Sequence, residues 1–260
     1  MTGHIMLHAG IDLHGTLITD HPEEVPARAV PRLLETMEQV RGRVRLYACT
    51  GNDLGFLRRK LPDDVMSRLD GAVLETGCVM SDLCTETVLV APEVLAEIKR
   101  LETELRDKHF EWVYKFARRL ATVSMFTRLG LRAADFRDAV HEEVRRLGAA
   151  QALRVTYSSV AVDIIPGGFN KLTGLRRLAG DEPTVGIADS MNDLELVRGA
   201  QYAFLPANCS GELVRQLQLD GKRIQKIGEA SGLHKNVAIL CSEGFTEGVS
   251  QALTFLARNL

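Results

Sequence analysis

The sequence predicts an α/β protein that has a parallel-sheet core and a smaller inserted α+β domain. Short apolar runs alternate with amphipathic helical patterns at both ends of the chain, which favours parallel strands joined by helices. Between about residues 82 and 166, paired strand-like runs joined by short connections alternate with helices instead. The length of 260 residues exceeds that of most single domains, so two domains of unequal size are expected.

In the first part of the chain, buried strands end in polar turns and helices follow them. Pro62 stops the second helix, and Pro31 stands near the start of the first, where proline is tolerated. The pattern predicts a strand, a helix, a strand, a helix and a short strand, in that order, at His4–Ile11, Ala27–Val40, Arg43–Cys49, Leu54–Leu61 and Ala72–Leu74.

The middle part, residues 82–166, is predicted to be the inserted domain, between core segments 1–81 and 167–260. Its pattern favours an antiparallel sheet covered by two helices. The predicted helices are Pro92–Lys108 and Ala133–Leu147. The predicted strands are Thr87–Val90, Glu111–Phe116, Ala121–Thr127, Leu153–Ser158 and Val160–Ile165.

The parallel pattern then resumes after the turn at residues 166–168. A helix is expected to begin near Asn170, which can cap it, and to carry Lys171 in its first turn. The remaining predicted elements are a strand, a helix, a strand and a final helix, at Thr184–Ala188, Asn192–Arg198, Tyr202–Leu205 and Phe245–Ala257.

Composition excludes several classes of function. The formal net charge of −2 does not indicate a basic surface that would bind nucleic acid. The longest apolar runs are too short to span a membrane. The N-terminus lacks the pattern of an export signal. Five scattered cysteines indicate reduced, small apolar fillers and a cytoplasmic protein. We expect a monomer or a small homo-oligomer.

Three predicted core strands end in side chains that suit one reaction. Asp12, Thr50 and Asp189 come directly after strands, and Lys171 begins a helix that should face the same edge of the sheet. Ligands of open parallel sheets bind at this edge. A carboxylate nucleophile, a metal-binding carboxylate, a hydroxyl and an ammonium are the groups that phosphoryl transfer requires. Asp193, at the next helix start, adds another oxygen donor, although helix starts also favour acidic residues for structural reasons.

The order of these groups resembles the four motifs of the haloacid dehalogenase superfamily. The first motif, usually hhhDxDGT, corresponds to HAGIDLHGTL at residues 8–17, and the second to LYACTG at residues 46–51. The third corresponds to Lys171, and the fourth, usually GDxxND, to ADSMND at residues 188–193. The insert between the second and third motifs is typical of the subclass with an α/β cap on a Rossmann-like core. That subclass contains phosphatases of sucrose phosphate, trehalose phosphate, mannosyl-phosphoglycerate and phosphoglycolate.

The resemblance implies a role for each matching position. Asp12 would be the nucleophile that forms an aspartyl-phosphate, with Mg²⁺ as the cofactor. The implied metal set is one oxygen of Asp12, the backbone carbonyl of His14, Asp189 and Asp193, where Asp193 alternatively orients Lys171 or a metal-bound water. The implied phosphate and substrate contacts are Thr50, Gly51, Asn52, Lys171 and Asn192.

His14 departs from the family pattern, which has aspartate there as the acid and base of hydrolysis. Three hypotheses follow. His14 could take over this role, since the ordinary pKa of histidine, about 6.5, suits proton transfer near neutrality. The chain could instead be a catalytically impaired protein that binds a phosphorylated ligand or regulates a partner. A third hypothesis is chemistry other than phosphomonoester hydrolysis.

Asn52 also departs from the pattern, because many capped relatives have arginine after Thr-Gly. The inserted domain must then supply specificity. The candidates for contacting the substrate are Lys115, Arg118 and Arg119, which lie in or beside one of its hairpin turns. A solvated basic turn is the alternative. The favoured function is Mg²⁺-dependent hydrolysis of a small phosphorylated metabolite, and the favoured substrate class is a sugar phosphate.

Overall fold

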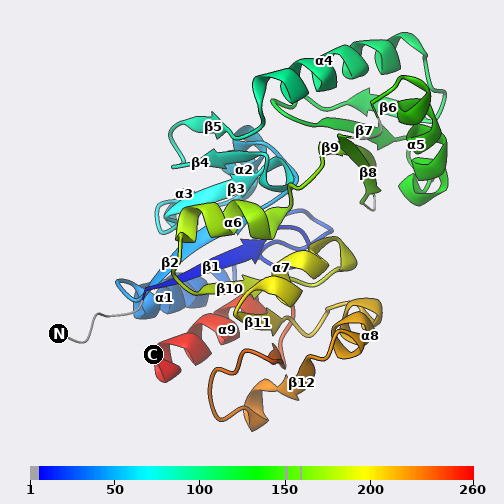
Figure 1. The fold of residues 1–260 in the computed structure, drawn as a ribbon. Helices are drawn as coiled ribbons and strands as arrows, with labels where there is room; N and C mark the ends of the chain where they lie inside the picture. The colour runs from blue at the N-terminus through cyan, green and yellow to red at the C-terminus, as the bar shows by residue number, and fades with distance from the viewer. Residues whose placement is uncertain (1–5, 150–151, 159) are drawn as a thin grey trace.

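The computed structural model describes residues 6–149, 152–158 and 160–260 of the chain. A larger body, the core, carries a smaller body, the cap, at one end (Figure 1). The helices of the core are α1 (Val30–Val40), α2 (Leu54–Lys60), α3 (Asp63–Met66), α6 (Lys171–Ala179), α7 (Leu194–Gly199), α8 (Gly211–Leu219) and α9 (Phe245–Asn259).

Within the described residues, the core strands form one nine-stranded sheet in the order β12-β13-β11-β10-β1-β2-β3-β4-β5. Neighbours from β12 to β3 are parallel, whereas β3, β4 and β5 pair antiparallel at one edge. The strands are β1 (Leu7–Asp12), β2 (Val44–Cys49), β3 (Gly71–Leu74), β4 (Val79–Ser81), β5 (Glu86–Val88), β10 (Thr184–Ile187), β11 (Tyr202–Leu205), β12 (Arg223–Lys226) and β13 (Val237–Leu240).

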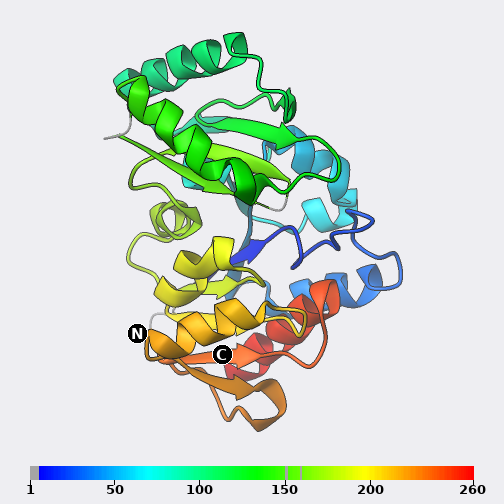
Figure 2. The same cartoon turned by 90° about the vertical axis from the view of Figure 1, so that its right-hand side faces the viewer.

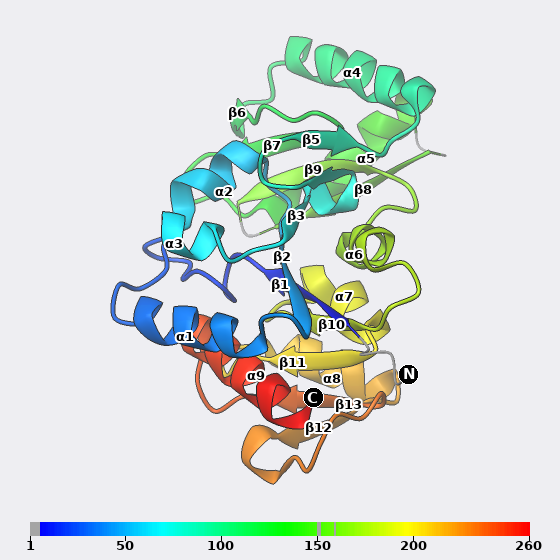
Figure 3. The same ribbon diagram turned by 90° about the vertical axis from the view of Figure 1, so that its left-hand side faces the viewer.

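Helices cover both faces of this sheet, which explains why its central strands are continuously apolar. α1 and α9 pack together on one face, and α6 and α7 lie on the other (Figure 3). All six residues of β1, in the middle of the sheet, are buried. The chain therefore reaches the carboxyl edge of the sheet at Asp12 from the central strand, which is fully buried.

The cap comprises α4 (Pro92–Asp107), β6 (Val113–Phe116), β7 (Val123–Thr127), α5 (Arg137–Arg146), β8 (Leu153–Tyr157) and β9 (Ala161–Pro166). Its described strands form an antiparallel sheet in the order β6-β7-β9-β8. Side chains of α4 and α5 share one apolar cluster with one face of this sheet. α4 lies farther from the core than the sheet does (Figures 1 and 2).

The structure confirms the predicted fold class of a largely parallel core sheet with an inserted α+β domain. One boundary differs: β5 lies inside the range 82–166 predicted for the insert, but it pairs with β4 at the edge of the core sheet. The alternation of a three-residue edge strand does not reveal which sheet it joins. The expected strand from His4 begins outside the described residues, which show it from Leu7.

No element is predicted between residues 206 and 244, where the structure has α8, β12 and β13. β12 reads RIQK and is polar at both ends, because it is an edge strand that exposes part of its side chains. Of the cysteines, Cys49, Cys78 and Cys241 are buried in apolar surroundings as predicted, whereas Cys84 is exposed. Across the described residues, no helix is long and apolar enough to cross a bilayer.

Gly77 packs closely against the start of α6. Its φ is +93°, and a Cβ there would lie 2.2 Å from the backbone oxygen of Asn170, the residue that caps α6. Gly42 has a φ of +79° but nothing within 4 Å of a Cβ. We expect Gly77→Ala to lower the free energy of unfolding by about 3 kcal/mol and Gly42→Ala by about 1 kcal/mol, in urea denaturation. Equal losses would contradict the close approach.

Candidate active site

The carboxyl edge of the core sheet brings three of the predicted site residues together. Asp12 ends β1 and is level with Cys49 of the neighbouring β2, so Thr50 follows one position farther along. On the other side of β1, Ile11 is level with Ile187 of β10, and Asp189 follows two positions after it. Asp12 and Thr50 are almost completely buried. Parallel register alone therefore gathers a carboxylate, a hydroxyl and a second carboxylate.

Lys171 enters this group from the first turn of α6. Asn170 caps the helix: its side chain accepts from the backbone N–H of Thr173 at 2.9 Å, and the Thr173 hydroxyl receives the backbone N–H of Asn170 at 3.0 Å. This capping box fixes where the helix begins. The ammonium Nζ of Lys171 then lies 2.5 Å from Oδ1 of Asp12 and 2.6 Å from Oδ1 of Asp193.

The three charged side chains of this cluster are buried together, with exposed side-chain fractions of 11% for Lys171, 5% for Asp12 and 2% for Asp193. Burial by itself lowers the pKa of Lys171, but the carboxylates of Asp12 and Asp193 outweigh burial and raise the pKa. The lysine therefore stays protonated, and one ammonium is shared by two carboxylates.

Asp189 stands beside this cluster, and no side chain in the described part of the chain forms a salt bridge with it. The hydroxyl of Thr16 donates to its Oδ1 at 3.1 Å. Gly15, whose φ is +75°, lies so close that a Cβ would be 2.4 Å from Oδ2. Burial, followed by the charges of Asp12 and Asp193, raises the pKa of Asp189 to about 7.

The residues present fit a hard divalent cation. With all groups ionised, the carboxylates of Asp12, Asp189 and Asp193 and the ammonium of Lys171 leave a formal charge of −2 in a buried place. Among the described residues, Asp189 accepts a hydrogen bond from the Thr16 hydroxyl and pairs with no Lys, Arg or His, so its negative charge lacks a compensating cation. Carboxylate and carbonyl oxygens suit Mg²⁺, which protein side chains rarely enclose completely. Throughout the described chain, no group of three or more His, Cys, Asp and Glu is arranged as a metal cage.

His14 points to a different set of neighbours. Its Nε2 lies 3.6 Å from Oε1 of Glu23, which also pairs with Lys60 at 2.9 Å. The imidazole ring packs against Phe56, with 5.2 Å between ring centroids. Burial lowers the pKa of His14, the charge of Glu23 opposes this effect, and the charge of Lys171 adds to it.

A buried carboxylate fastens the cap to the core. Glu75, which follows β3, is 1% exposed. Its oxygens accept hydrogen bonds from the backbone N–H groups of Leu120 at 2.7 Å and Ala121 at 2.9 Å, and from the Thr122 hydroxyl at 3.0 Å. These donors belong to the turn between β6 and β7. Burial raises the pKa of Glu75, while these hydrogen bonds act to lower it.

Arg119, in the same turn, contacts the loop that follows Thr50. Its Nη2 donates to Oδ1 of Asn52 at 2.7 Å, and its Nη1 lies 3.4 Å from a carboxylate oxygen of Asp53. Arg119 is buried, whereas Arg118 is exposed. The two adjacent arginines, both predicted to contact substrate, therefore occupy different environments.

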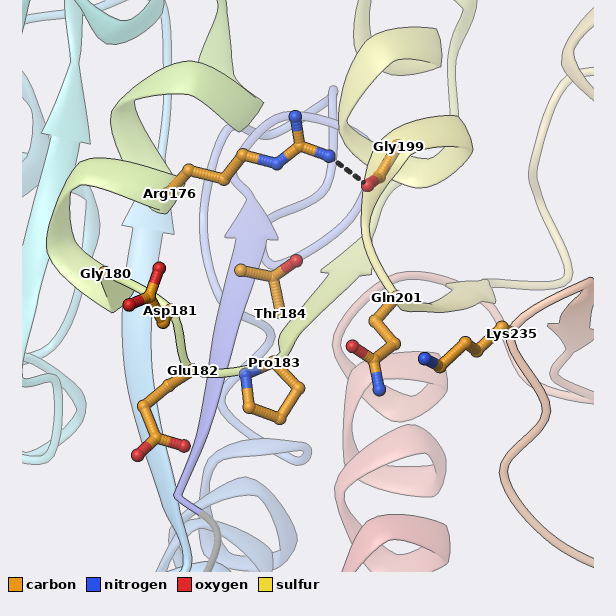
Figure 4. Close-up of a pocket in the computed structure, with 9 residues that line it drawn as sticks. All are labelled: Arg176, Gly180, Asp181, Glu182, Pro183, Thr184, Gly199, Gln201 and Lys235. Atoms are coloured by element: carbon orange, nitrogen blue, oxygen red, sulfur yellow. Dashed lines mark hydrogen bonds between the residues drawn. The ribbon is translucent and has the colours of Figure 1, made fainter.

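A cavity of about 760 Å³ lies between α2 and the β6–β7 hairpin, and Arg118, Arg119 and Lys115 line it together with Asn52. Gly51 and Asn192, also predicted to contact the substrate, are exposed. A second cavity, of about 340 Å³, lies at the opposite end of β10, around Thr184 and Arg176 (Figure 4). It contains none of the predicted site residues.

Several residues around the site had no predicted role. Thr16 belongs to the first motif, so its contact with Asp189 could have been suspected. Asn208 donates to the carbonyl of Gly15 at 2.7 Å, and no local pattern reveals this contact across 193 positions. The same holds for Glu23 beside His14. Such contacts depend on loop paths that periodicity does not specify.

Solved structures with the same fold span nearly the whole chain. A Thermoplasma acidophilum protein has a TM-score of 0.68 and 14% identity, over 99% of this chain and 100% of that one. Sucrose-phosphatase from Synechocystis, solved with sucrose and phosphate, has a TM-score of 0.63 and 18% identity, over 96% and 97%. A haloacid dehalogenase-like hydrolase from Bacteroides thetaiotaomicron has a TM-score of 0.63 and 15% identity, over 97% and 99%. No family model and no curated protein matches the sequence.

The buried cluster predicts a large effect of removing its cation. Lys171→Met leaves Asp12 and Asp193 without their ammonium, so we expect a loss of about 3 kcal/mol or more in the free energy of unfolding. In the double variant Lys171→Met/Asp193→Asn, part of this loss should be recovered because one uncompensated charge is gone. Urea denaturation without divalent cations measures both. If the double variant is less stable than the single one, uncompensated charge is not the cause.

Proposed function

We propose that this chain, whose fold is that of the haloacid dehalogenase-like hydrolases, is a Mg²⁺-dependent phosphatase of a small phosphorylated metabolite. The observation that carries the proposal is the buried ammonium of Lys171 between Asp12 and Asp193, beside Thr50 and Asp189 at the sheet edge. The likeness to a sucrose-phosphatase solved with sucrose and phosphate supports a sugar phosphate as the substrate.

In the first half of the reaction, a carboxylate oxygen of Asp12 attacks the phosphorus. The bond from phosphorus to the ester oxygen breaks, and its electron pair leaves with that oxygen. The ammonium of Lys171 and the hydroxyl of Thr50 bind the non-bridging phosphoryl oxygens, whose charge they stabilise. Asp12, Asp189 and the backbone carbonyl of His14 would hold Mg²⁺, which when bound offsets the negative charge of the phosphate and carboxylates.

In the second half, water attacks the aspartyl-phosphate, and the bond between phosphorus and Asp12 breaks. The products are inorganic phosphate and the free carboxylate. We assign proton transfer to His14, which gives a proton to the departing ester oxygen and takes one from the attacking water. Oε1 of Glu23 lies 3.6 Å from Nε2 of His14, and its negative charge favours the protonated imidazolium form.

The first test is hydrolysis of p-nitrophenyl phosphate and of a panel of sugar phosphates. We expect activity with Mg²⁺ and none after chelation, and Asp12→Asn should lower kcat roughly a thousandfold or more because the nucleophile is lost. Activity that survives Asp12→Asn would sink this mechanism. If wild type and His14→Asp are both inert while phosphorylated ligands still raise Tm, the chain is a phospho-ligand-binding protein instead.

The second test compares substrates whose leaving groups differ in their need for a proton. An alkyl phosphate needs a proton on its departing oxygen, whereas p-nitrophenolate leaves without one. Because burial lowers the pKa of His14, its proton-donating form is scarce at neutral pH. We expect His14→Asp to raise kcat on alkyl phosphates by roughly tenfold or more, which is part of the roughly hundredfold or greater contribution usual for general acid–base catalysis. On p-nitrophenyl phosphate the change should be smaller. Equal factors on both substrates would exclude leaving-group protonation as the step that His14 limits.

A further inference from the structure

A chain of hydrogen bonds runs from the cap to the hydroxyl of Thr50. Nη2 of Arg119 donates to Oδ1 of Asn52 at 2.7 Å. Asn52 in turn donates to Oγ1 of Thr50, from its backbone N–H at 3.1 Å and from its side-chain Nδ2 at 3.4 Å. The Thr50 hydroxyl therefore accepts in both contacts, and its own hydrogen has no acceptor among the described residues.

The chemistry of arginine fixes the direction of this chain. A guanidinium group donates and cannot accept, so the oxygen of the Asn52 amide must face Arg119. The amide nitrogen then faces Thr50 and donates to it, which leaves the hydroxyl hydrogen for another acceptor. If the amide were reversed, Oδ1 would accept that hydrogen from Thr50.

Docking of the cap holds Arg119 in this position. Nζ of Lys99 donates to the backbone carbonyl of Arg119 at 2.7 Å, and Glu75 binds the next two backbone N–H groups, those of Leu120 and Ala121. The side chain of Arg119 is 5% exposed. Its Nε is buried and has no hydrogen-bond partner within the described part of the chain. The guanidinium is held through its Nη atoms, by Asn52, Asp53 and the backbone carbonyl of Arg118, to which Nη1 donates at 3.2 Å.

We propose that Arg119 is a positioning residue for Thr50. By setting the amide of Asn52, it keeps the Thr50 hydroxyl as a donor for a phosphoryl oxygen, and it does so only when the cap is docked. The proposal rests on the proposed function, because it requires that Thr50 binds phosphate. It makes phosphate binding in the core depend on a cap residue that need not touch the phosphate.

Binding of inorganic phosphate, measured by calorimetry with Mg²⁺ present, tests the proposal without turnover. Arg119→Met should weaken binding about tenfold, the effect expected when a hydrogen bond to a charged group is lost. In an Asn52→Ala background, which has no amide to reverse, Arg119→Met should cause no further loss. Asn52→Asp should also weaken binding, because a carboxylate accepts the Thr50 hydrogen. This second variant does not depend on the stability of the Arg119 variant.

Arg132→Met is the matched control, since Arg132 is an exposed arginine elsewhere in the cap, paired with Asp135. It should bind phosphate as the wild type does. Hydrogen exchange at Leu120 and Ala121 reports whether the cap is still docked in each variant. The same tenfold loss from Arg119→Met in both backgrounds, or no loss in either, would overturn the positioning role. A wild type that binds no phosphate would overturn the proposed function, and this inference with it.

Discussion

The ammonium of Lys171 between the carboxylates of Asp12 and Asp193 is the interaction on which the rest of the site depends. The three charges come from the end of β1, the start of α6 and the turn after β10. Isolated charges in such a place would be very costly, so the helix and the two strand ends must keep a position in which each charge has a partner. This requirement explains why the start of α6 is fixed by a capping box and by close packing at Gly77.

The same edge of the sheet receives the cap through a second buried carboxylate, Glu75. Buried carboxylates thus hold core elements to one another at Lys171 and hold the cap hairpin to the core at Glu75. Thr50 lies between them in the fold: it follows β2, next to Asp12, and Asn52 connects it to Arg119. Under the proposed function, the group that binds phosphate would be controlled from both sides.

Asn52 illustrates how a sequence pattern can indicate a difference without explaining it. An asparagine after Thr-Gly, where many capped proteins of the superfamily that the sequence resembles have arginine, predicts that the cap must provide contacts. The structure places the guanidinium of Arg119 against that asparagine. The two residues are 67 positions apart, so no local sequence pattern predicts their contact. The neighbouring Arg118, which is equally basic, is exposed. Composition of the turn could not distinguish the two arginines, because the choice depends on which side chain faces the core when the hairpin docks.

The sequence by itself determined the alternation of strands and helices, the insert in the middle of the chain, and the placing of Asp12, Thr50, Lys171 and Asp189 at one edge. These follow from local periodicity and from the rule that parallel strands end together. Tertiary structure decided that His14 faces Glu23, that β5 joins the core sheet and that Arg119 reaches Asn52. It also pairs Asp193 with Lys171, which is one of the roles that the resemblance implied for Asp193. Each of these contacts depends on the path of a loop or on the docking of the cap. Both are determined by interactions between groups that lie far apart in the chain, which local sequence patterns do not show.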